Sequence, residues 1–427
     1  MLQKIKSILL RDSFKKVGIY TITASLCKAI SFAALPFFVN TLSEGDIGIL
    51  NIFGNCIVFL TPIISMGVIF TISIDYFKLS KEKYAQVFST GLVIPVVLSL
   101  LLLPVLYIFR KPLERSFNFQ QEFFWLIPIC LFFNFSFEAF VVLMRNQNKV
   151  KLFTKVSLLK ILLEVSLSII FIIFIYRNWY SRALAFLLSG IVIGVLFFFH
   201  IKKNKFLVKG INYQVLRNEL SFGLSGLVLQ TAIFFVGTSD KFFVMSFFGK
   251  VQAGYYAVAS TFAAIQYIVC VSLLQYLQPL LFREFAVFQN WKDQKQLYYK
   301  YFIAMIVTLA GTILFTFIVY NFVLKPTYKE YLYYFYILSI GSFVWTISNI
   351  FLQFIVFNKN KKVIFFLSLT CIFISLVVNY ICSKYFNIRW LGLGQIVTNI
   401  SVLFIILFVN RKLNYFTPNE SVSKKSL

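Results

Sequence analysis

Four ionisable residues lie well inside apolar stretches of the first half of this 427-residue chain: Lys28, Glu138, Lys160 and Glu164. A charged residue in the middle of a membrane-spanning helix costs at least about 2.5 kcal/mol on insertion scales, so it usually faces a protein interior or a water-filled cavity. Buried cations of this kind bind anions, and buried carboxylates bind cations or carry protons. The four residues therefore indicate a charged cavity within lipid.

The depths of these residues follow from a rise of about 1.5 Å per residue, counted from the edge with the basic loops. Lys28 and Glu164 then lie about 18 Å deep, Lys160 about 12 Å and Glu138 about 9 Å. Lys160 and Glu164 are four positions apart, on one face of a helix. Two interpretations stay open for this pair: the charges neutralise each other, or they line the cavity. Lys28 likewise either lines a cavity, or snorkels, or pairs with Glu138 or Glu164.

Four further charged residues lie near the ends of apolar segments. Asp240 and Lys241 lie near the outer edge of the seventh segment, where they form an interfacial ion pair or, alternatively, a gate or cation contact. Arg145 and Arg283 lie at cytoplasmic ends, as ordinary anchors or as contacts for a lipid phosphate at the inner mouth. The candidate cavity cations are thus Lys28, Lys160, Arg145 and Arg283, and the candidate ion-coupling carboxylates are Glu138, Glu164 and Asp240.

The composition predicts an all-α integral membrane protein that holds these residues in spanning helices. Hydrophobic residues make up 59% of the chain and charged residues 13%, about half of the roughly 25% found in soluble domains. Twelve apolar segments have the length of a membrane span. They cover approximately residues 16–39, 48–74, 85–109, 122–144, 152–176, 182–201, 219–247, 252–282, 298–323, 331–357, 363–383 and 389–410.

The basic residues predict the orientation of these segments. Loops on one side hold more than twice as many Lys and Arg residues as loops on the other, which places that side and both termini in the cytoplasm. The net charge of +26 is explained by these loops and by anionic lipid head groups, so nucleic acid is not an expected partner. The long apolar run after the basic amino terminus indicates a retained first span.

Six spans in each half predict two lobes of like orientation. The turn 249–256 resembles the turn 43–50, a shift of about half the chain. Parallel repeats of this kind occur in secondary transporters, with the substrate site between the halves. The predicted organisation is an amino-terminal lobe at 1–201, a basic cytoplasmic linker at 202–217, a carboxy-terminal lobe at 218–412 and a cytoplasmic tail at 413–427.

Several kinds of chemistry have no motif in the sequence. The six cysteines are scattered without paired spacing and His200 is the single histidine, so neither a disulfide nor a histidine-based metal site is expected. A G-x-x-x-x-G-K-[ST] run is absent, so the chain has no P-loop for ATP. We therefore expect no catalytic residues, no metal and no cofactor, and transport driven by an ion or substrate gradient.

Short motifs in both halves carry a resemblance to a known family. Pro36 is followed by Leu42-Ser43-Glu44-Gly45-Asp46-Ile47-Gly48, and the second half contains Thr238-Ser239-Asp240-Lys241, Phe248-Gly249 and Ala253-Gly254-Tyr255-Tyr256. With twelve expected spans, the chain resembles the polysaccharide-transporter branch of the multidrug/oligosaccharidyl-lipid/polysaccharide exporter (MOP) superfamily, which includes the O-antigen flippases. The resemblance covers nearly the whole chain in layout.

This resemblance implies a flippase of the bacterial cytoplasmic membrane. The implied substrate is an undecaprenyl-pyrophosphate-linked oligosaccharide, moved from the inner to the outer leaflet by alternating access with H⁺ or Na⁺ as coupling ion. The implied partners are membrane lipids and, for polysaccharide assembly, a polymerase and a chain-length regulator, around a monomeric transporter. Two alternatives stay open: a cation-coupled multidrug exporter of the same superfamily, and a membrane polysaccharide polymerase or ligase, which usually has a long outer loop that this chain lacks.

Overall fold

The computed structural model describes residues 19–412 except positions 21, 209, 211, 288–290, 358–360, 388–389 and 391. Some helical side chains within this range are also outside the description, at positions 70–71, 74, 78, 218–226, 275–287, 291–297, 300, 356–357 and 361. Every regular element in the described residues is a helix, which confirms the all-α class. The chain divides into two compact units, unit 1 (Met1–Leu227) and unit 2 (Val228–Leu427).

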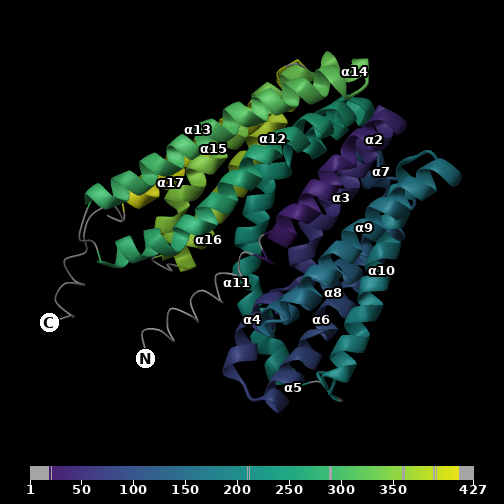
Figure 1. Ribbon diagram of the computed structural model, residues 1–427, viewed down its shortest axis with the longest axis vertical. Helices are drawn as coiled ribbons and strands as arrows, with labels where there is room; N and C mark the ends of the chain where they lie inside the picture. Colours follow the sequence, from purple (N-terminus) through teal and green to yellow (C-terminus); the bar gives the residue numbers. More distant parts are fainter. Residues whose placement is uncertain are drawn as a thin grey trace. The chain divides into compact units, whose positions relative to one another are not determined.

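Figure 1 labels the helices of both units along the chain. Unit 1 contains a helix over residues 22–33 and the elements α2 (Leu35–Thr41), α3 (Glu44–Ser65), α4 (Val68–Lys78), α5 (Lys81–Gly91), α6 (Val93–Ile108), α7 (Arg110–Phe117), α8 (Phe123–Asn146), α9 (Val150–Phe174) and α10 (Trp179–Lys203). The boundary between the units falls within α11 (Tyr213–Thr238). Unit 2 continues with α12 (Asp240–Val287), α13 (Trp291–Phe322), α14 (Pro326–Lys329), α15 (Leu332–Phe357), α16 (Lys361–Tyr385) and α17 (Leu393–Lys412).

Eleven helical stretches in the described residues are long and apolar enough to cross a membrane. They correspond to all of the predicted segments except the seventh, and the chain is therefore a multi-pass membrane protein. The seventh segment, 219–247, falls across α11 and the start of α12, where part of the sequence lies outside the described side chains. The described part of α11 contributes only the shorter apolar stretch Leu227–Thr238. A total of twelve spans stays a prediction.

Breaks within the predicted segments follow from proline and from left-handed backbone. The segment predicted at 48–74 is two helices, because Met66 (φ 40°) and Gly67 (φ 76°) adopt left-handed conformations between α3 and α4. Pro62 lies one turn before this break and accepts a hydrogen bond from the Met66 N–H at 3.0 Å. In α12 only Gly249 (φ 78°) leaves the helix, so the predicted turn at 249–256 is a sharp bend at one residue, followed by helix.

The Leu42–Gly48 motif joins two helices of unit 1 at their amino ends. Ser43 is the N-cap of α3, and its Oγ accepts a hydrogen bond from the Asp46 N–H at 3.1 Å. Oδ1 of Asp46 accepts a second hydrogen bond, at 3.1 Å, from the N–H of Trp179, the first residue of α10. Asp46, in the first turn of α3, thus links that helix to the beginning of α10, where unpaired N–H groups and the helix dipole favour an anion.

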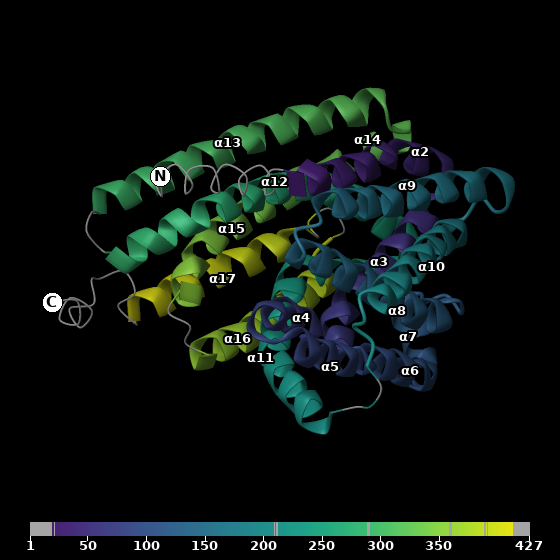
Figure 2. The ribbon, with the colours of Figure 1, turned by 60° about the horizontal axis from the view of Figure 1, so that its bottom comes forward.

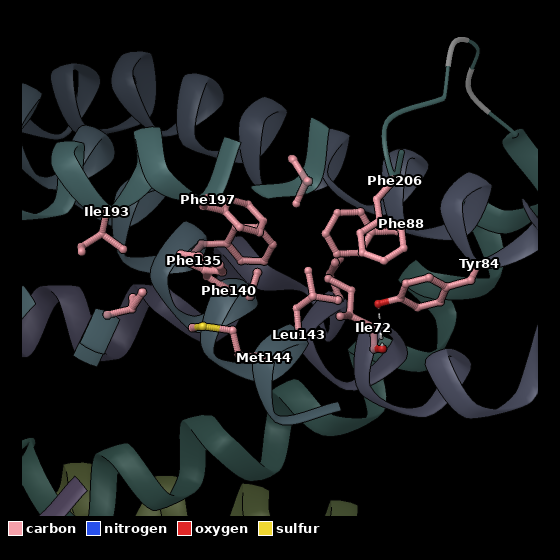
Figure 3. Close-up of a cluster of buried hydrophobic side chains, with 14 of the residues drawn as sticks. Ile72, Tyr84, Phe88, Phe135, Phe140, Leu143, Met144, Ile193, Phe197 and Phe206 are labelled. Atoms are coloured by element: carbon pink, nitrogen blue, oxygen red, sulfur yellow. Dashed lines mark hydrogen bonds between the residues drawn. The ribbon is translucent and has the colours of Figure 1, made fainter. Parts of the chain in front are cut away.

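The core of unit 1 is built from aromatic side chains of α5, α8 and α10 (Figure 3). The Tyr84 hydroxyl donates a hydrogen bond to the Ile72 carbonyl at 3.3 Å, the dashed line in Figure 3. The rings of Phe88 and Phe206 lie 5.6 Å apart. Phe206 belongs to the predicted linker, 202–217, and the Ser89 Oγ donates to the carbonyl of Val208, two residues further on, at 2.9 Å. This part of the linker is therefore packed against unit 1.

Unit 2 is a layered bundle in which α12 packs against α13 and α15, and α15 packs against α17. Figures 1 and 2 both show these four helices side by side. Close approach at the beginning of α17 requires a small residue, because a Cβ at Gly394 would lie 2.6 Å from the Asn379 Oδ1 of α16. Tyr255 of α12 stacks on Tyr331 with ring centroids 3.8 Å apart. The contact at Gly394 holds the beginning of α17 close to Asn379 of α16, one of the polar residues described below.

Candidate functional site

Lys160 and Glu164 form an ion pair on α9 in unit 1. The distance from Lys160 Nζ to Glu164 Oε2 is 3.4 Å, and the two side chains are 13% and 20% exposed. The four-residue spacing places both on one helical face. Of the two interpretations of the sequence, mutual neutralisation is thus present in the structure. Both side chains remain partly exposed, so a solute can reach the charged groups.

Aromatic rings surround the ammonium group of Lys160. Its Nζ lies 4.9 Å from the ring centroid of Phe137 on α8 and 4.9 Å from that of Phe186 on α10. A cation over an aromatic face is attracted by the ring quadrupole, more strongly where water is excluded. The ammonium group is therefore held between three helices, α8, α9 and α10, in addition to its ion pair with Glu164.

Glu138 of α8 belongs to a series of hydrogen bonds that does not include the Lys160–Glu164 ion pair. Its Oε1 accepts a hydrogen bond from the Asn134 Nδ2 at 3.2 Å, and the same amide group lies 3.3 Å from the Thr61 Oγ1 on α3. Lys160 is the charged group that acts on Glu138 electrostatically. Glu138, Lys160 and Glu164 therefore lie in one electrostatic neighbourhood of unit 1.

Arg182, in the first turn of α10, is a charged residue that the sequence analysis did not single out. Its guanidinium Cζ lies 4.2 Å from the ring centroid of Phe38 on α2. Glu164 is the charged group that acts on it electrostatically. The segment was predicted to begin at residue 182, whereas α10 begins at Trp179, so Arg182 lies within the first turn of the helix and not at its very start.

Lys28 and Arg145 are exposed charged residues of unit 1. Helix 22–33 packs on α9 through Thr23, whose Oγ1 is 3.1 Å from the Thr154 Oγ1, while the Lys28 side chain is exposed. Within the described residues Lys28 makes no ion pair with Glu138 or Glu164, so the pairing considered for it is absent there. Arg145 is exposed at the end of α8. The side chain of Arg283, on α12, lies outside the described residues.

Asp240 of unit 2 is a buried carboxylate with one bonded and one unbonded oxygen. The residue is 4% exposed, and its Oδ2 accepts a hydrogen bond from the Tyr256 hydroxyl at 2.5 Å. Its Oδ1 is buried and has no hydrogen-bond partner. Lys241 acts on Asp240 electrostatically. The sequence offered an interfacial ion pair or a cation contact at this place; burial to this degree differs from an exposed interfacial pair.

A polar network lies beside Asp240, at the junction of α11, α12 and α16. Asn379 Nδ2 donates a hydrogen bond to the Ser239 Oγ at 3.0 Å, and the Ser239 and Ser375 hydroxyls are 2.9 Å apart. Ser375 also donates to the Phe235 carbonyl at 2.7 Å. Ser375 and Asn379 are four positions apart on one face of α16. The sequence analysis did not single out Asn379, Ser375 or Tyr256.

The distribution of His, Cys, Asp and Glu side chains bears on metal binding. Among the residues that the structure describes, no group of three or more His, Cys, Asp and Glu side chains gathers closely enough to hold a metal ion. The polar groups at Asp240 are one carboxylate, a tyrosine hydroxyl, two serine hydroxyls and an amide. Oxygen atoms of this kind suit a proton or a weakly bound monovalent cation better than a zinc-type metal.

The fold of the chain is similar to that of several solved membrane transporters. The chain matches the inward-facing conformation of a multidrug resistance MATE family transporter of the MOP superfamily, with a TM-score of 0.70, 14% identity and coverage of 96% of this chain and 100% of that one. A MATE transporter of Vibrio cholerae (TM-score 0.55, 16% identity, 93% and 100% covered) and a MOP superfamily transporter of Pyrococcus furiosus (0.54, 14%, 93% and 95%) are also similar.

Residues 40–330 match the family model of polysaccharide biosynthesis proteins. This is more than half of the chain, so the protein belongs to that family, within the polysaccharide-transporter branch of the MOP superfamily. The resemblance found in the short motifs is thus confirmed. No curated protein sequence matches the chain. The family and the fold together make this protein a membrane transporter.

Proposed function

We propose that this transporter moves an undecaprenyl-pyrophosphate-linked oligosaccharide from the inner to the outer leaflet of a bacterial cytoplasmic membrane, for cell-surface polysaccharide synthesis. The observation that carries the proposal is the match of residues 40–330 to polysaccharide biosynthesis proteins on a chain with a transporter fold. A glycan assembled in the cytoplasm needs a carrier for its polar head group, because unpaired polar groups in hydrocarbon are costly. The function proposed is transport, without catalysis.

Lys160 is the residue of unit 1 best placed to contact the pyrophosphate. Its ammonium group combines a charge-assisted contact with Glu164 at 3.4 Å and partial exposure. An anionic head group could exchange with Glu164 for the same ammonium group, since phosphate and carboxylate accept the same kind of hydrogen bond. Lys28 and Arg145, both exposed, are further proposed contacts, as is Arg283.

Asp240 is the carboxylate best placed to bind the coupling ion. A buried carboxylate oxygen without a partner is unfavourable unless it is protonated or bound to a cation. The Oδ1 of Asp240 has no hydrogen-bond partner. The preceding residue, Ser239, accepts a hydrogen bond from Asn379, so further polar atoms lie near this carboxylate, and the arrangement fits a proton or Na⁺. Glu138, bonded to Asn134, is the corresponding proposed group in unit 1.

A cation-coupled multidrug exporter is the second candidate function. It is favoured by the similarity to a multidrug resistance MATE family transporter over 96% of this chain. At 14% identity that similarity concerns the fold. The carboxylates Glu138 and Glu164 would serve this function by binding a cationic substrate, whereas Lys160 would oppose it.

Transport by the purified full-length chain in liposomes distinguishes the two candidates. A fluorescent undecaprenyl-pyrophosphate oligosaccharide is placed in both leaflets, and an impermeant oxidant measures the fraction that reaches the outer leaflet with time. We expect the protein to accelerate this exchange and the double variant K160Q/E164Q, which preserves neutrality, to slow it. K155Q, on the exposed side of the same helix, is the control. Exchange no faster than in empty liposomes, together with uptake of an amphipathic cation, would support the multidrug exporter.

A further inference from the structure

Arg182 presents a set of unused hydrogen-bond donors. A guanidinium group has five N–H donors in a planar fork and stays charged at all ordinary pH values. Its Cζ lies over the Phe38 ring, 4.2 Å from the ring centroid, a cation–π contact that uses none of these hydrogen-bond donors. Within the described residues no hydrogen bond or ion pair engages the donors at its edge. The side chain is partly buried, so bulk water satisfies these donors only in part.

The carboxylate that acts on Arg182 electrostatically already forms an ion pair with another residue. Glu164 is the carboxylate near Arg182, but its Oε2 is already 3.4 Å from the Lys160 ammonium. Glu138 is bonded to Asn134 instead. Two cations therefore share one nearby carboxylate, and the guanidinium is the one without a direct contact to it. An anion that binds here would accept hydrogen bonds from the free N–H groups of the Arg182 guanidinium.

The position of Arg182 relates it to Lys160. Phe186 lies one helical turn after Arg182 on α10, about 6 Å along the axis. The same Phe186 ring contacts the Lys160 ammonium at 4.9 Å. The Lys160 ammonium thus contacts α10 one helical turn away from Arg182. Arg182 is at the end of α10 that the basic loops predict to lie outside the cell.

We propose that Arg182 is a second contact for a diphosphate head group, which it binds after Lys160 on the way to the outer leaflet. The inference rests on the proposed function. The planar fork of a guanidinium matches two phosphate oxygens at once, which a lysine cannot do. Phe38 holds the fork in place, so little conformational freedom is lost when the anion binds. Arg182 therefore favours diphosphates over small anions with one charge.

Calorimetric titration of the full-length protein in nanodiscs with inorganic pyrophosphate tests this site. We expect R182Q to weaken binding about tenfold or more, because charge-assisted hydrogen bonds are lost. R182K should restore only part of the affinity, since it keeps the charge and loses the fork. R115Q, which removes an exposed arginine from α7, is the matched control for net charge, and we expect its affinity to stay within about twofold of the native protein.

Three results would overturn the inference: no pyrophosphate binding by the native protein, native affinity in R182Q, or equal weakening in R182Q and R115Q. Far-ultraviolet circular dichroism of each variant shows whether it is folded, and R182K supplies a second folded variant. The liposome assay separates this inference from the proposed function. If R182Q exchanges glycans at the native rate, the inference about Arg182 fails and the proposed function stands. If the native protein binds pyrophosphate through Arg182 but moves no glycan, the proposed function fails and the pyrophosphate site stands.

Discussion

The Tyr256 hydroxyl lies 2.5 Å from the Oδ2 of Asp240, although the two residues are 16 positions apart in the chain. The bend at Gly249 brings them together, because it lies nearly midway between them and reverses the helix direction. The Tyr256 ring also contacts Tyr334 at 5.4 Å. This hydrogen bond joins the two sides of the bend and fixes one oxygen of the carboxylate.

Tyr256→Phe should therefore destabilise unit 2. The substitution keeps the ring but removes the donor to a buried carboxylate, a loss of about 1–3 kcal/mol. The thermal unfolding midpoint in detergent measures the effect, with Tyr336→Phe as control at an exposed tyrosine. In Y256F/D240N the carboxylate charge is gone, so the double variant should lose less than the sum of the single variants. Additive losses would show that the two residues act independently.

Lys160→Gln should be more harmful alone than together with Glu164→Gln. Alone, it leaves a carboxylate without its ammonium partner inside a membrane-spanning helix, a loss of about 1–3 kcal/mol that is moderated by the remaining exposure of Glu164. The double variant removes both charges and should recover most of the lost stability. Monodisperse yield from size-exclusion chromatography, followed over a temperature series, compares them. Equal yields for the single and the double variant would contradict the ion pair.

Asp46→Ala should loosen the junction of α3 and α10. The carboxylate accepts the Trp179 N–H at 3.1 Å and lies near the Ser43 N-cap, so its removal leaves helix-terminal donors unpaired. Loss of a capping interaction amounts to about 0.5–2 kcal/mol. Hydrogen exchange at the beginning of α10, measured by mass spectrometry, should accelerate. Glu82→Ala, in the exposed first turn of α5, should leave that exchange unchanged.

Gly394→Ala and Gly311→Ala should have opposite effects. A Cβ at Gly394 would lie 2.6 Å from the Asn379 Oδ1, and Asn379 is held by its hydrogen bonds to Ser239 and Ser375. Overpacking at such a place costs about 1–3 kcal/mol. A Cβ at Gly311, in α13, meets nothing within 4 Å and should stabilise that helix by about 0.5–1 kcal/mol. Unfolding midpoints of the two variants that shift in the same direction would be inconsistent with this packing.

The helices and the main charge pair could be predicted from the sequence, because each depends on local spacing. Apolar length alone predicts a spanning helix, and the four-residue separation of Lys160 and Glu164 alone predicts a shared face. The break at Met66 is harder, since Met is a good helix former and only the neighbouring Gly67 and Pro62 indicate a bend there.

The partners of the buried polar groups could not be predicted in the same way. Ser375 and Asn379 share a face of α16, but their bonds to Ser239 depend on which helix packs there. Lys28 follows Cys27 by one position and so lies about 100° further around the helix. Which of these two residues faces the protein depends on how helix 22–33 packs on α9, and the sequence does not fix this. Arg182 was not singled out because a boundary error of three residues placed it at the very end of its predicted segment.

The cysteine distribution equips the native chain for chemical labelling. Five of the six thiols are buried, and Cys27 alone is partly exposed. A maleimide reagent applied to the intact protein should accordingly react at one position, next to Lys28, without the construction of a cysteine-free background. An impermeant maleimide would then report directly whether water reaches this face of the first helix in living cells.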